Sequence, residues 1–286
     1  MILIADGGST KADWVLLKKS GEELLRTRTA GLNPAVFDEG LLVKRIQENS
    51  DLATYKDKIT RVYFYGAGCG TEKAALLLRL IFESFFVNAL VDVKEDTYAA
   101  TYAVTTNPGI VCILGTGSNS CYFDGENVDV RIASLGYVLM DEASGNYFGK
   151  KLIRDYYYHK MPKDIAKQFE EQFEIDADTI KRNVYKKENP NTYLAHFAEF
   201  IFKNERNVYF NKVLHKGIKD FFKNKILPYK EAENIPVHFV GSIAYFAQDI
   251  IKDVARFYMI ELGNIVRRPI DGLIDYHRKK MKLEKL

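Results

Sequence analysis

The sequence contains one local pattern twice: an apolar run, a short turn of glycines and hydroxyl residues, and a second apolar run. The first turn is DGGST at residues 6–10, and the second is GTGS at residues 115–118. Apolar runs joined by a short glycine-containing turn are typical of antiparallel strand pairs, so each copy predicts a β-hairpin with a tip of small residues. Two matched hairpins constrain the chain toward two related lobes.

The chemistry of the two turns predicts binding of a polyphosphate. Glycine lets backbone N–H groups approach an anion closely, and Ser or Thr adds a hydroxyl donor. Only the first turn carries an acid, Asp6, in a position where it could hold a metal ion. Two such tips facing each other, one of them with an acid, predict ATP and Mg²⁺ between two lobes. The simpler alternative is that GTGS is only a tight turn.

Length and charge exclude several classes of protein. With 286 residues the chain is long enough for two domains, and its apolar and charged fractions are those of a globular protein. A net charge of +3 with both signs interspersed requires no nucleic-acid and no membrane partner. No segment approaches the roughly 20 apolar residues of a membrane span, and the N-terminus lacks a signal-peptide pattern. We therefore expect a cytoplasmic protein.

The cysteines and histidines form no disulfide or metal-binding pattern. Cys69, Cys112 and Cys121 are odd in number and contain no C-x-x-C pair, and two of them lie in apparent buried strands. The five histidines are scattered without ligand spacing. The cysteines are therefore interpreted as small hydrophobic residues, and a metal site built from protein ligands alone is not expected.

Residues 1–107 alternate between strand and helix patterns and are predicted to form an N-terminal lobe. Asp96 is expected at the start of its last helix. Three strands followed by alternating helices and strands describe a mixed α/β layer whose topology resembles ribonuclease H. Beyond the hairpin, the expected elements are strands at 24–29, 62–65 and 89–91 and helices at 38–48, 71–86 and 97–102.

Residues 108–286 are predicted to form a second ribonuclease H-like lobe, with a helical insertion over about residues 147–230. The many aromatic residues of the insertion are interpreted as helix core rather than as a ligand site. No low-complexity linker is present, so we expect closely packed lobes with a cleft between them. Beyond the hairpin, the expected elements are strands at 128–132 and 237–240, a helix from 241 to about 258, and a last helix from about 271.

Six short segments, taken together, carry a family pattern. They are DGGSTK with DW at residues 6–14, GLNP at 31–34, ED with AA at 95–100, LGTGSN at 114–119, the loop 136–145 ending in DEASG, and VGS at 240–242. Their order and spacing resemble the sugar kinase/Hsp70/actin superfamily, specifically its N-acetylglucosamine kinase-like branch. That branch also includes the activator ATPases of 2-hydroxyacyl-CoA dehydratases and benzoyl-CoA reductase.

The resemblance implies roles for individual residues. Asp6 would hold Mg²⁺ through water. Asp96 would contact the sugar as general base, accepting the proton of a hydroxyl while that oxygen attacks the γ-phosphate of ATP. A helix N-cap is the alternative for Asp96, and the two roles are compatible. The implied ATP-binding residues are Gly8, Ser9, Thr10 and Lys11 in the first turn, Gly115, Thr116, Gly117 and Ser118 in the second, and Gly241 and Ser242 after a later strand.

Asn33 and Asp141 are implied to bind sugar hydroxyls, because amide and carboxylate groups suit adjacent hydroxyls. For Asn33, a simple Asn-Pro turn is an equal alternative. The loop around Asp141 departs from the family pattern, since Ser134, Met140 and Ala143 stand where the family has glycine. A left-handed glycine is not replaced without strain. We therefore expect a loop of different course or a reshaped pocket.

The leading hypothesis is an ATP-dependent kinase that phosphorylates the 6-hydroxyl of an amino sugar, with N-acetylglucosamine first. N-acetylmuramic acid and glucosamine would use the same residues. One alternative is an activator ATPase, which needs cysteines from each subunit for an iron–sulfur cluster, and Cys69 has no near partner. Another is a non-catalytic sugar or nucleotide sensor. The resemblance also implies a homodimer.

Overall fold

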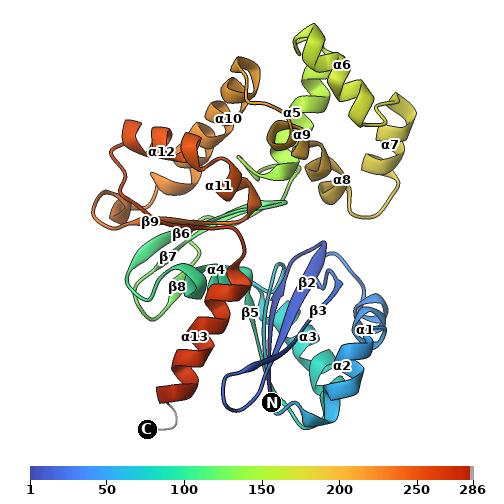
Figure 1. Ribbon diagram of the computed structural model, residues 1–286, viewed down its shortest axis with the longest axis vertical. Helices are drawn as coiled ribbons and strands as arrows, with labels where there is room; N and C mark the ends of the chain where they lie inside the picture. Colours follow the sequence, from blue (N-terminus) through green and yellow to red (C-terminus); the bar gives the residue numbers. More distant parts are fainter. Residues whose placement is uncertain (284–286) are drawn as a thin grey trace. The chain divides into compact units, whose positions relative to one another are not determined.

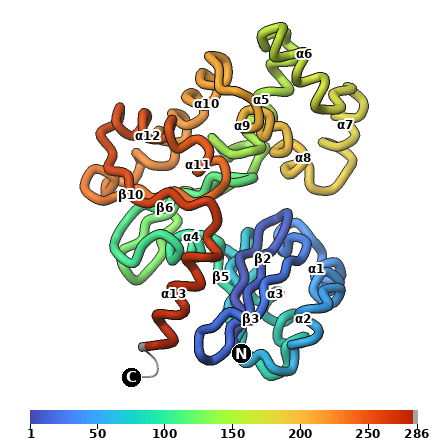
Figure 2. Tube along the Cα trace, in the orientation of Figure 1, coloured from blue at the N-terminus to red at the C-terminus, as the bar shows by residue number. Residues whose placement is uncertain are grey.

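The structure is a computed structural model that describes residues 1–283. The chain divides into two compact units (Figure 1). Unit 1 contains Met1–Ala103 and the chain from Pro269 onward, and unit 2 contains Val104–Arg268. Each unit has one five-stranded sheet, and Figure 2 traces the chain through both. No helix within the described residues is long and apolar enough to cross a lipid bilayer.

The sheet of unit 1 has the strand order β3-β2-β1-β4-β5. The pairs β1–β2 and β2–β3 are antiparallel, as the hairpin predicts, whereas β1–β4 and β4–β5 are parallel. The carboxyl ends of β1, β4 and β5 therefore lie at the same end of the sheet. The strands are β1 (Ile2–Gly7), β2 (Lys11–Leu17), β3 (Glu23–Ala30), β4 (Arg61–Gly66) and β5 (Leu90–Glu95).

Helices cover both faces of this sheet. Alternation along β1 sends Ala5 to one face and Asp6 to the other. On the face of Ala5, the Phe82 ring packs 5.7 Å from Trp14 and 4.9 Å from Phe64 between ring centroids. This first face is covered by α1 (Glu39–Gln47), α2 (Ser50–Tyr55), the short turn η1 (Lys56–Lys58) and α3 (Glu72–Phe85), and the second by α4 (Asp96–Val104) and α13 (Pro269–Leu283).

The predicted helices of unit 1 begin at capping side chains. Asp38 accepts a hydrogen bond from the backbone of Leu41 at the start of α1, and Thr71 does the same for Ala74 in α3. Such caps satisfy backbone donors that the first helical turn leaves unpaired. The expected helices at 38–48 and 71–86 are therefore confirmed, with both ends within one residue of the observed helices.

Unit 2 repeats the strand order of unit 1, as β8-β7-β6-β9-β10. Its first two pairs are again antiparallel and its last two parallel. The strands are β6 (Gly109–Leu114), β7 (Ser118–Phe123), β8 (Val128–Asp129), β9 (Val237–Val240) and β10 (Leu262–Val266). The third strand is shorter than the predicted 128–132. The sequence analysis missed β10, because Gly263 and Asn264 interrupt its apolar pattern.

The insertion between β8 and β9 is helical, as predicted. Buried aromatics such as Phe148, Phe169 and Phe222 form its core. The predicted helix after β9 is interrupted at Ala247 and forms two helices. The helices are α5 (Gly145–Tyr157), α6 (Lys163–Gln172), α7 (Ala177–Tyr185), α8 (Pro190–Phe197), α9 (Glu199–Lys203), α10 (Val208–Phe221), the π-helical turn η2 (Phe222–Ile226), η3 (Lys230–Glu233), α11 (Ser242–Phe246) and α12 (Gln248–Phe257).

The last helix, α13, packs within unit 1, although the sequence analysis grouped residues 108–286 into one lobe. Its buried Leu273 and Ile274 join the core of the second sheet face. At its start, Asp271 lies 2.6 Å from Arg26, and Arg278 donates to the carbonyl of Gly21 at 2.9 Å. The last helix therefore completes the cover of the first sheet.

Candidate active site

Two carboxylates lie at the carboxyl end of the unit 1 sheet. Asp6 is near the end of β1, and Asp96 follows β5 as the first residue of α4. Burial, helped by the negative charge of Asp13, raises the pKa of Asp6 to about 7. Burial likewise raises the pKa of Asp96 to about 7, with added repulsion from Glu95 and Asp6. The two carboxyl groups are therefore electrostatically coupled, and ionisation of one disfavours ionisation of the other.

Asp6 differs from its neighbour Asp13 in its partners. Asp13 lies directly opposite Asp6 on β2, and it is paired with Arg28 at 2.6 Å and Lys11 at 3.2 Å. Asp6 has no ion-pair partner within residues 1–283. Asp6 is therefore the acid of this pair that remains for an external cation, while Lys11, predicted to bind ATP, contacts Asp13.

The first glycine turn is held in place by the loop around Asn33. The Asn33 side chain donates to the Ser9 hydroxyl at 2.8 Å and accepts from the backbone N–H of Ala35 at 2.9 Å. A Cβ on Gly31 would lie 2.1 Å from the Ser9 carbonyl oxygen, so only glycine fits there. Asn33 thus forms the Asn-Pro turn that the sequence analysis gave as the alternative to sugar binding. It also retains one amide hydrogen for a ligand.

Glu95 is a site residue that the sequence analysis assigned no role. Thr97 donates its hydroxyl to Glu95 at 3.3 Å, and a Cβ on Gly70 would lie 2.8 Å from the Glu95 carboxylate. Burial raises the pKa of Glu95, and burial with the charges of Asp96 and Glu95 raises the pKa of Cys69 to about 12. Cys69 is therefore a neutral thiol rather than a reactive one. The only sequence signal for Glu95 is its position directly before Asp96.

The second glycine turn, in unit 2, offers an open backbone and an unused hydroxyl. A Cβ on Gly115 would meet no atom within 4 Å, so the turn is open above that residue. Ser118 is 5% exposed, and its hydroxyl oxygen is buried without a hydrogen-bond partner. The turn is closed below by bonds from the N–H of Gly145 to the Gly115 carbonyl at 2.8 Å and from Asn146 to Thr116 at 3.0 Å. This buried, unpaired hydroxyl suits an oxyanion ligand.

Asp141 lies against this second turn. Its carboxylate accepts from the backbone N–H of Ser118 at 3.2 Å and from the Asn146 amide at 2.8 Å. A Cβ on Gly117 would come within 3.0 Å of the same carboxylate. Asp141 therefore holds the turn, and each of its oxygens keeps a further acceptor position. Asn146 was missed by sequence reasoning, because nothing in its pattern distinguishes it from a helical surface residue.

Two lysines with lowered pKa values surround the segment that carries Asp141. Lys225, on η2, is 2% exposed, and its ammonium lies 3.4 Å from the carbonyl of Ala133. Lys150 donates to the carbonyl of Tyr137. Burial lowers both lysine pKa values, while the charges of Asp141 and Glu142 oppose that change. Both acids therefore lie close enough to the two lysines to favour their charged forms.

The departures from the family's glycines are resolved by the backbone. Ala143 has φ 58° and Gly136 has φ 78°, whereas Met140 is not among the residues with positive φ. The loop therefore keeps a left-handed conformation at Ala143 despite its side chain, and strain is present at that residue. Asp141 itself has φ 72°.

Gly241 and Ser242 lie beside the second turn, within unit 2. Gly241 has φ 122°, and a Cβ on it would lie 2.2 Å from the carbonyl oxygen of Leu114. This close approach places Gly241 next to Gly115, and Ser242 begins α11. The two segments of unit 2 that were predicted to bind ATP, the turn at residues 115–118 and the turn at 241–242, are therefore neighbours.

No family model matches the sequence. Among solved structures, a candidate N-acetylglucosamine kinase from Porphyromonas gingivalis is 34% identical to this chain, covers 98% of it and 99% of its own length, and superposes with a TM-score of 0.90. The chain belongs to the N-acetylglucosamine kinase-like branch of the sugar kinase/Hsp70/actin superfamily. The predicted fold class, with two ribonuclease H-like lobes, is thereby confirmed.

Two solved structures of lower sequence identity share the fold. A candidate N-acetylglucosamine kinase from Chromobacterium violaceum is 14% identical with a TM-score of 0.71, covering 96% of this chain and 98% of its own. A ROK-family glucokinase from Streptomyces griseus, in complex with glucose and AMPPNP, is 15% identical with a TM-score of 0.59, covering 96% and 97%. These two likenesses support the fold alone.

The site residues predicted from the sequence fall into two groups, one in each unit. Unit 1 brings together the acids, the first glycine turn and Asn33. Unit 2 brings together the second turn, Asp141 and the Gly241 turn. Within residues 1–283, no three His, Cys, Asp or Glu side chains form a group that could hold a metal ion, so a cation at Asp6 would depend largely on water and phosphate oxygens.

Proposed function

We propose that the protein is an ATP-dependent kinase that transfers the γ-phosphate of ATP to the 6-hydroxyl of an amino sugar, most simply N-acetylglucosamine. The observation that carries this proposal is the pair of acids at the end of the unit 1 sheet, in a chain 34% identical to a candidate N-acetylglucosamine kinase over nearly its whole length. One acid without a cation partner and one acid beside it are what a metal-assisted phosphoryl transfer requires.

In the proposed reaction, the acceptor hydroxyl oxygen forms a bond to the γ-phosphorus of ATP. The bond between that phosphorus and the β,γ-bridging oxygen breaks, and ADP leaves. The hydroxyl proton moves to the carboxylate of Asp96. With a pKa of about 7, Asp96 is ionised in a large share of molecules at neutral pH and is basic enough to accept this proton.

The two glycine turns would hold the phosphates of ATP. Gly8, Ser9 and Thr10 would surround the transferring phosphate. The turn from Gly115 to Ser118 would contact the other end of the triphosphate. The unpaired hydroxyl of Ser118 and the open space above Gly115 support this assignment. Asp6 would hold Mg²⁺ through water, and the ion when bound supplies positive charge that offsets the phosphate charge.

The acceptor would be bound by the remaining hydrogen-bonding capacity of Asn33 and Asp141. Each already makes two hydrogen bonds within its own unit, which fixes its orientation before a sugar arrives. Preorganised groups of this kind lose little entropy on binding. The rival activator-ATPase function fits less well, because all three cysteines are buried thiols rather than exposed ligands.

The proposal is tested by measuring ADP release from Mg-ATP with N-acetylglucosamine, N-acetylmuramic acid, glucosamine, glucose and no sugar. We expect turnover with one amino sugar, and phosphate on its 6-oxygen by NMR of the product. Asp96→Asn should abolish this turnover, whereas Asp57→Asn, an exposed acid in the same unit, should not. ADP release that ignores every sugar and survives Asp96→Asn would overturn the proposal.

A further inference from the structure

One cation of unit 2 is buried without an opposite charge beside it. Lys225, on η2, is 2% exposed. Its ammonium donates to the carbonyl of Ala133 at 3.4 Å and reaches Sδ of Met140 at 4.0 Å, and within residues 1–283 no carboxylate forms an ion pair with it. A lysine is almost never fully buried without such a pair, because the charge loses its hydration. This burial costs folding free energy, so it indicates a role other than stability.

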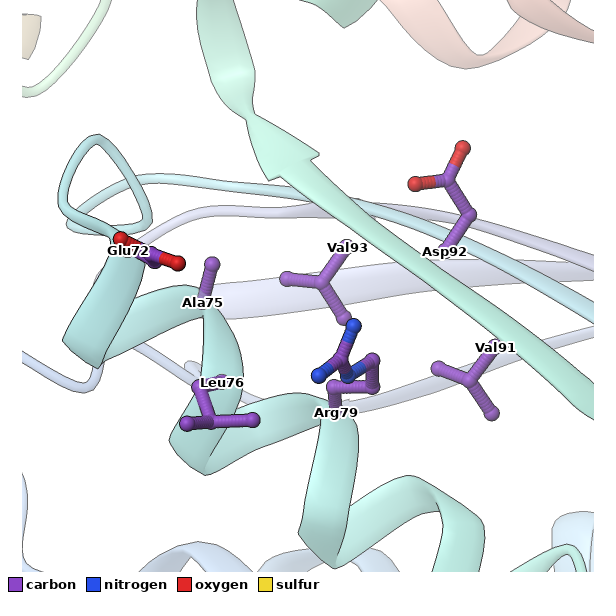
Figure 3. A pocket seen from close by; sticks show the side chains of 7 residues that line it. All are labelled: Glu72, Ala75, Leu76, Arg79, Val91, Asp92 and Val93. Carbon is purple, nitrogen blue, oxygen red and sulfur yellow. The ribbon is translucent and has the colours of Figure 1, made fainter.

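Arg79 of unit 1 shows the ordinary arrangement of a cation for comparison. It lines the groove between α3 and β5, as Figure 3 shows, and its side chain is 50% exposed. Water stabilises the guanidinium charge there, and Glu83 lies 4.0 Å away. Lys225 differs from Arg79 in both respects.

The segment that this lysine contacts belongs to the loop between β8 and α5. The apolar side chains of Leu135, Val138 and Leu139 in that loop are exposed, so burial of apolar surface does not hold it in place. The backbone N–H groups of Leu139 and Met140 bond to the carbonyl of Gly136 and form one turn within it. Side-chain contacts from the neighbouring helices therefore fix the rest of its course.

Lys225 joins the two ends of the exposed part of this loop. Ala133 lies at the start of that part, and Met140 lies at its end, directly before Asp141 in the chain. One group that binds both positions closes the chain between them and reduces the number of conformations that the loop can adopt. The backbone at Asp141 is therefore held by a contact one residue away.

The π-helical turn η2 directs a second side chain to the same loop. Asn224, next to Lys225, donates to the carboxylate of Glu142 at 3.0 Å. Adjacent residues of a regular α-helix lie about 100° apart around its axis, whereas both of these reach one loop. Single π-helical turns are found frequently at functional sites. η2 thus holds the loop on both sides of Asp141.

These contacts leave the carboxylate of Asp141 available. The ammonium of Lys225 hydrogen-bonds to a carbonyl of the loop and not to this carboxylate. Asp141 accepts only from Ser118 and Asn146 within the described residues, and each of its oxygens keeps a further acceptor position. The lysine can therefore orient Asp141 without competing with a ligand.

We propose that Lys225 is the positioning residue of the acceptor site: it fixes the loop from Ala133 to Met140 and thereby orients Asp141 for the sugar. The inference rests on the proposed function, in which Asp141 binds a sugar hydroxyl. Lys225 acts through the loop and not by contact with the substrate. It therefore controls affinity for the sugar rather than affinity for ATP or the rate of transfer.

Lys225→Met tests this inference, because methionine keeps much of the length of the side chain and removes its charge. KM for the amino sugar that the unaltered protein phosphorylates, with N-acetylglucosamine tried first, should rise at least about tenfold, while kcat and KM for ATP stay within about twofold. Lys223→Met is the matched control, since Lys223 is an exposed lysine of the same turn, and it should leave all three constants unchanged. Steady-state kinetics with each substrate varied in turn measures them.

A second readout needs no turnover. Amide hydrogen exchange of residues 133–141 should become faster in Lys225→Met and not in Lys223→Met. Chemical denaturation should show no loss of stability, since methionine replaces a buried charge. Unchanged exchange in the loop, an unchanged KM for the sugar, or a destabilised protein that loses affinity for both substrates alike would each overturn the inference. If the unaltered protein phosphorylates no sugar, the proposed function fails, while the exchange measurement still decides whether Lys225 fixes the loop.

Discussion

The two units share a scaffold and differ in the chemistry placed on it. Both sheets have the same strand order and the same sequence of antiparallel and parallel pairs. Both also have a glycine turn between their first two strands. In unit 1 that turn follows an acid without a cation partner, and a second acid begins the helix after the fifth strand. In unit 2 the turn offers an open glycine and an unpaired hydroxyl, and its acid, Asp141, is already hydrogen-bonded to the turn.

This difference indicates a division of labour that the shared fold does not dictate. Parallel strands deliver side chains to one end of a sheet whatever those side chains are. The residues at the strand ends then decide whether the unit supplies charge or only donors. Under the proposed function, unit 1 would supply the charged groups for the cation and the transferred proton, and unit 2 would supply neutral donors for phosphate oxygens.

The largest effect expected from breaking this asymmetry is on the acids of unit 1. Asp6→Asn should lower kcat by about 10²-fold or more, because it removes the acid proposed to hold the cation. The same change should raise the free energy of unfolding slightly, since burial and Asp13 both disfavour the Asp6 charge. Steady-state kinetics and chemical denaturation measure the two effects.

Ser118→Ala in unit 2 provides the comparison. It removes one donor to phosphate rather than a charge, so we expect a loss of only about tenfold, mainly as a raised KM for ATP. Equal losses from the two substitutions would contradict the division of labour between the units.

The sequence alone predicts the hairpins, the capped helices and the acids, because each has a strong local signal. β10 has none, and its glycine is required by contact with another strand: a Cβ on Gly263 would lie 2.3 Å from the ring of His238. Asn146 and Lys225 were missed for a related reason, since their roles arise only when distant segments fold together. Local patterns therefore reveal what one segment can do, and long-range packing determines the rest.

The second prediction concerns buried histidine in unit 1. The ring of His277 forms a 3.0 Å hydrogen bond with the hydroxyl of Tyr65. Burial, together with the charges of Lys280 and Lys94, lowers the pKa of His277 to about 3. Because the unfolded chain binds this proton near pH 6.5, the contribution of His277 to stability is full above pH 6.5 and falls by about 1.4 kcal/mol per pH unit until pH nears 3. The raised pKa values of Asp6 and Asp96 act in the opposite direction below about pH 7, so the His277 contribution is the difference between the unaltered protein and a variant without the histidine. Urea unfolding across this range measures the slope.

His277→Gln should remove the contribution of His277 to that dependence, since glutamine does not titrate. His238 of unit 2 is also buried with a lowered pKa, so His238→Gln tests the second unit in the same way. An unchanged slope in the His277→Gln protein would show that protonation of a different group causes the loss of stability at low pH.

The third prediction is a kinetic pKa that belongs to unit 1. Since Asp96 must be ionised to accept a proton, kcat/KM should rise about tenfold per pH unit and level off above about pH 7. Glu95→Gln should move this midpoint downward, because the charge of Glu95 helps to raise the pKa of Asp96. Thr116→Ala, in the turn of unit 2, should leave the midpoint in place, and a shift there would assign the titration to unit 2.

The smallest effect concerns backbone strain, in which the units also differ. All five non-glycine residues with positive φ in the described chain lie in unit 2, Ala143 among them. Ala143→Gly should relieve about 1–2 kcal/mol of left-handed strain. It also removes a fully buried methyl group, worth about 0.8 kcal/mol, and adds the backbone freedom of glycine to the unfolded chain.

These opposing terms should leave the Ala143→Gly protein within about 1 kcal/mol of the unaltered protein. Gly136→Ala is the informative counterpart, since Gly136 has φ 78° and open space around it. Strain is the only unfavourable term introduced there, and the reduced freedom of the unfolded chain offsets part of it. The substitution should destabilise by about 1 kcal/mol. If denaturation instead shows Ala143→Gly to be strongly destabilising, the Ala143 methyl group contributes more packing than its conformation costs. The alanine at position 143, where the family has glycine, would then stabilise the protein by packing in the unit 2 core.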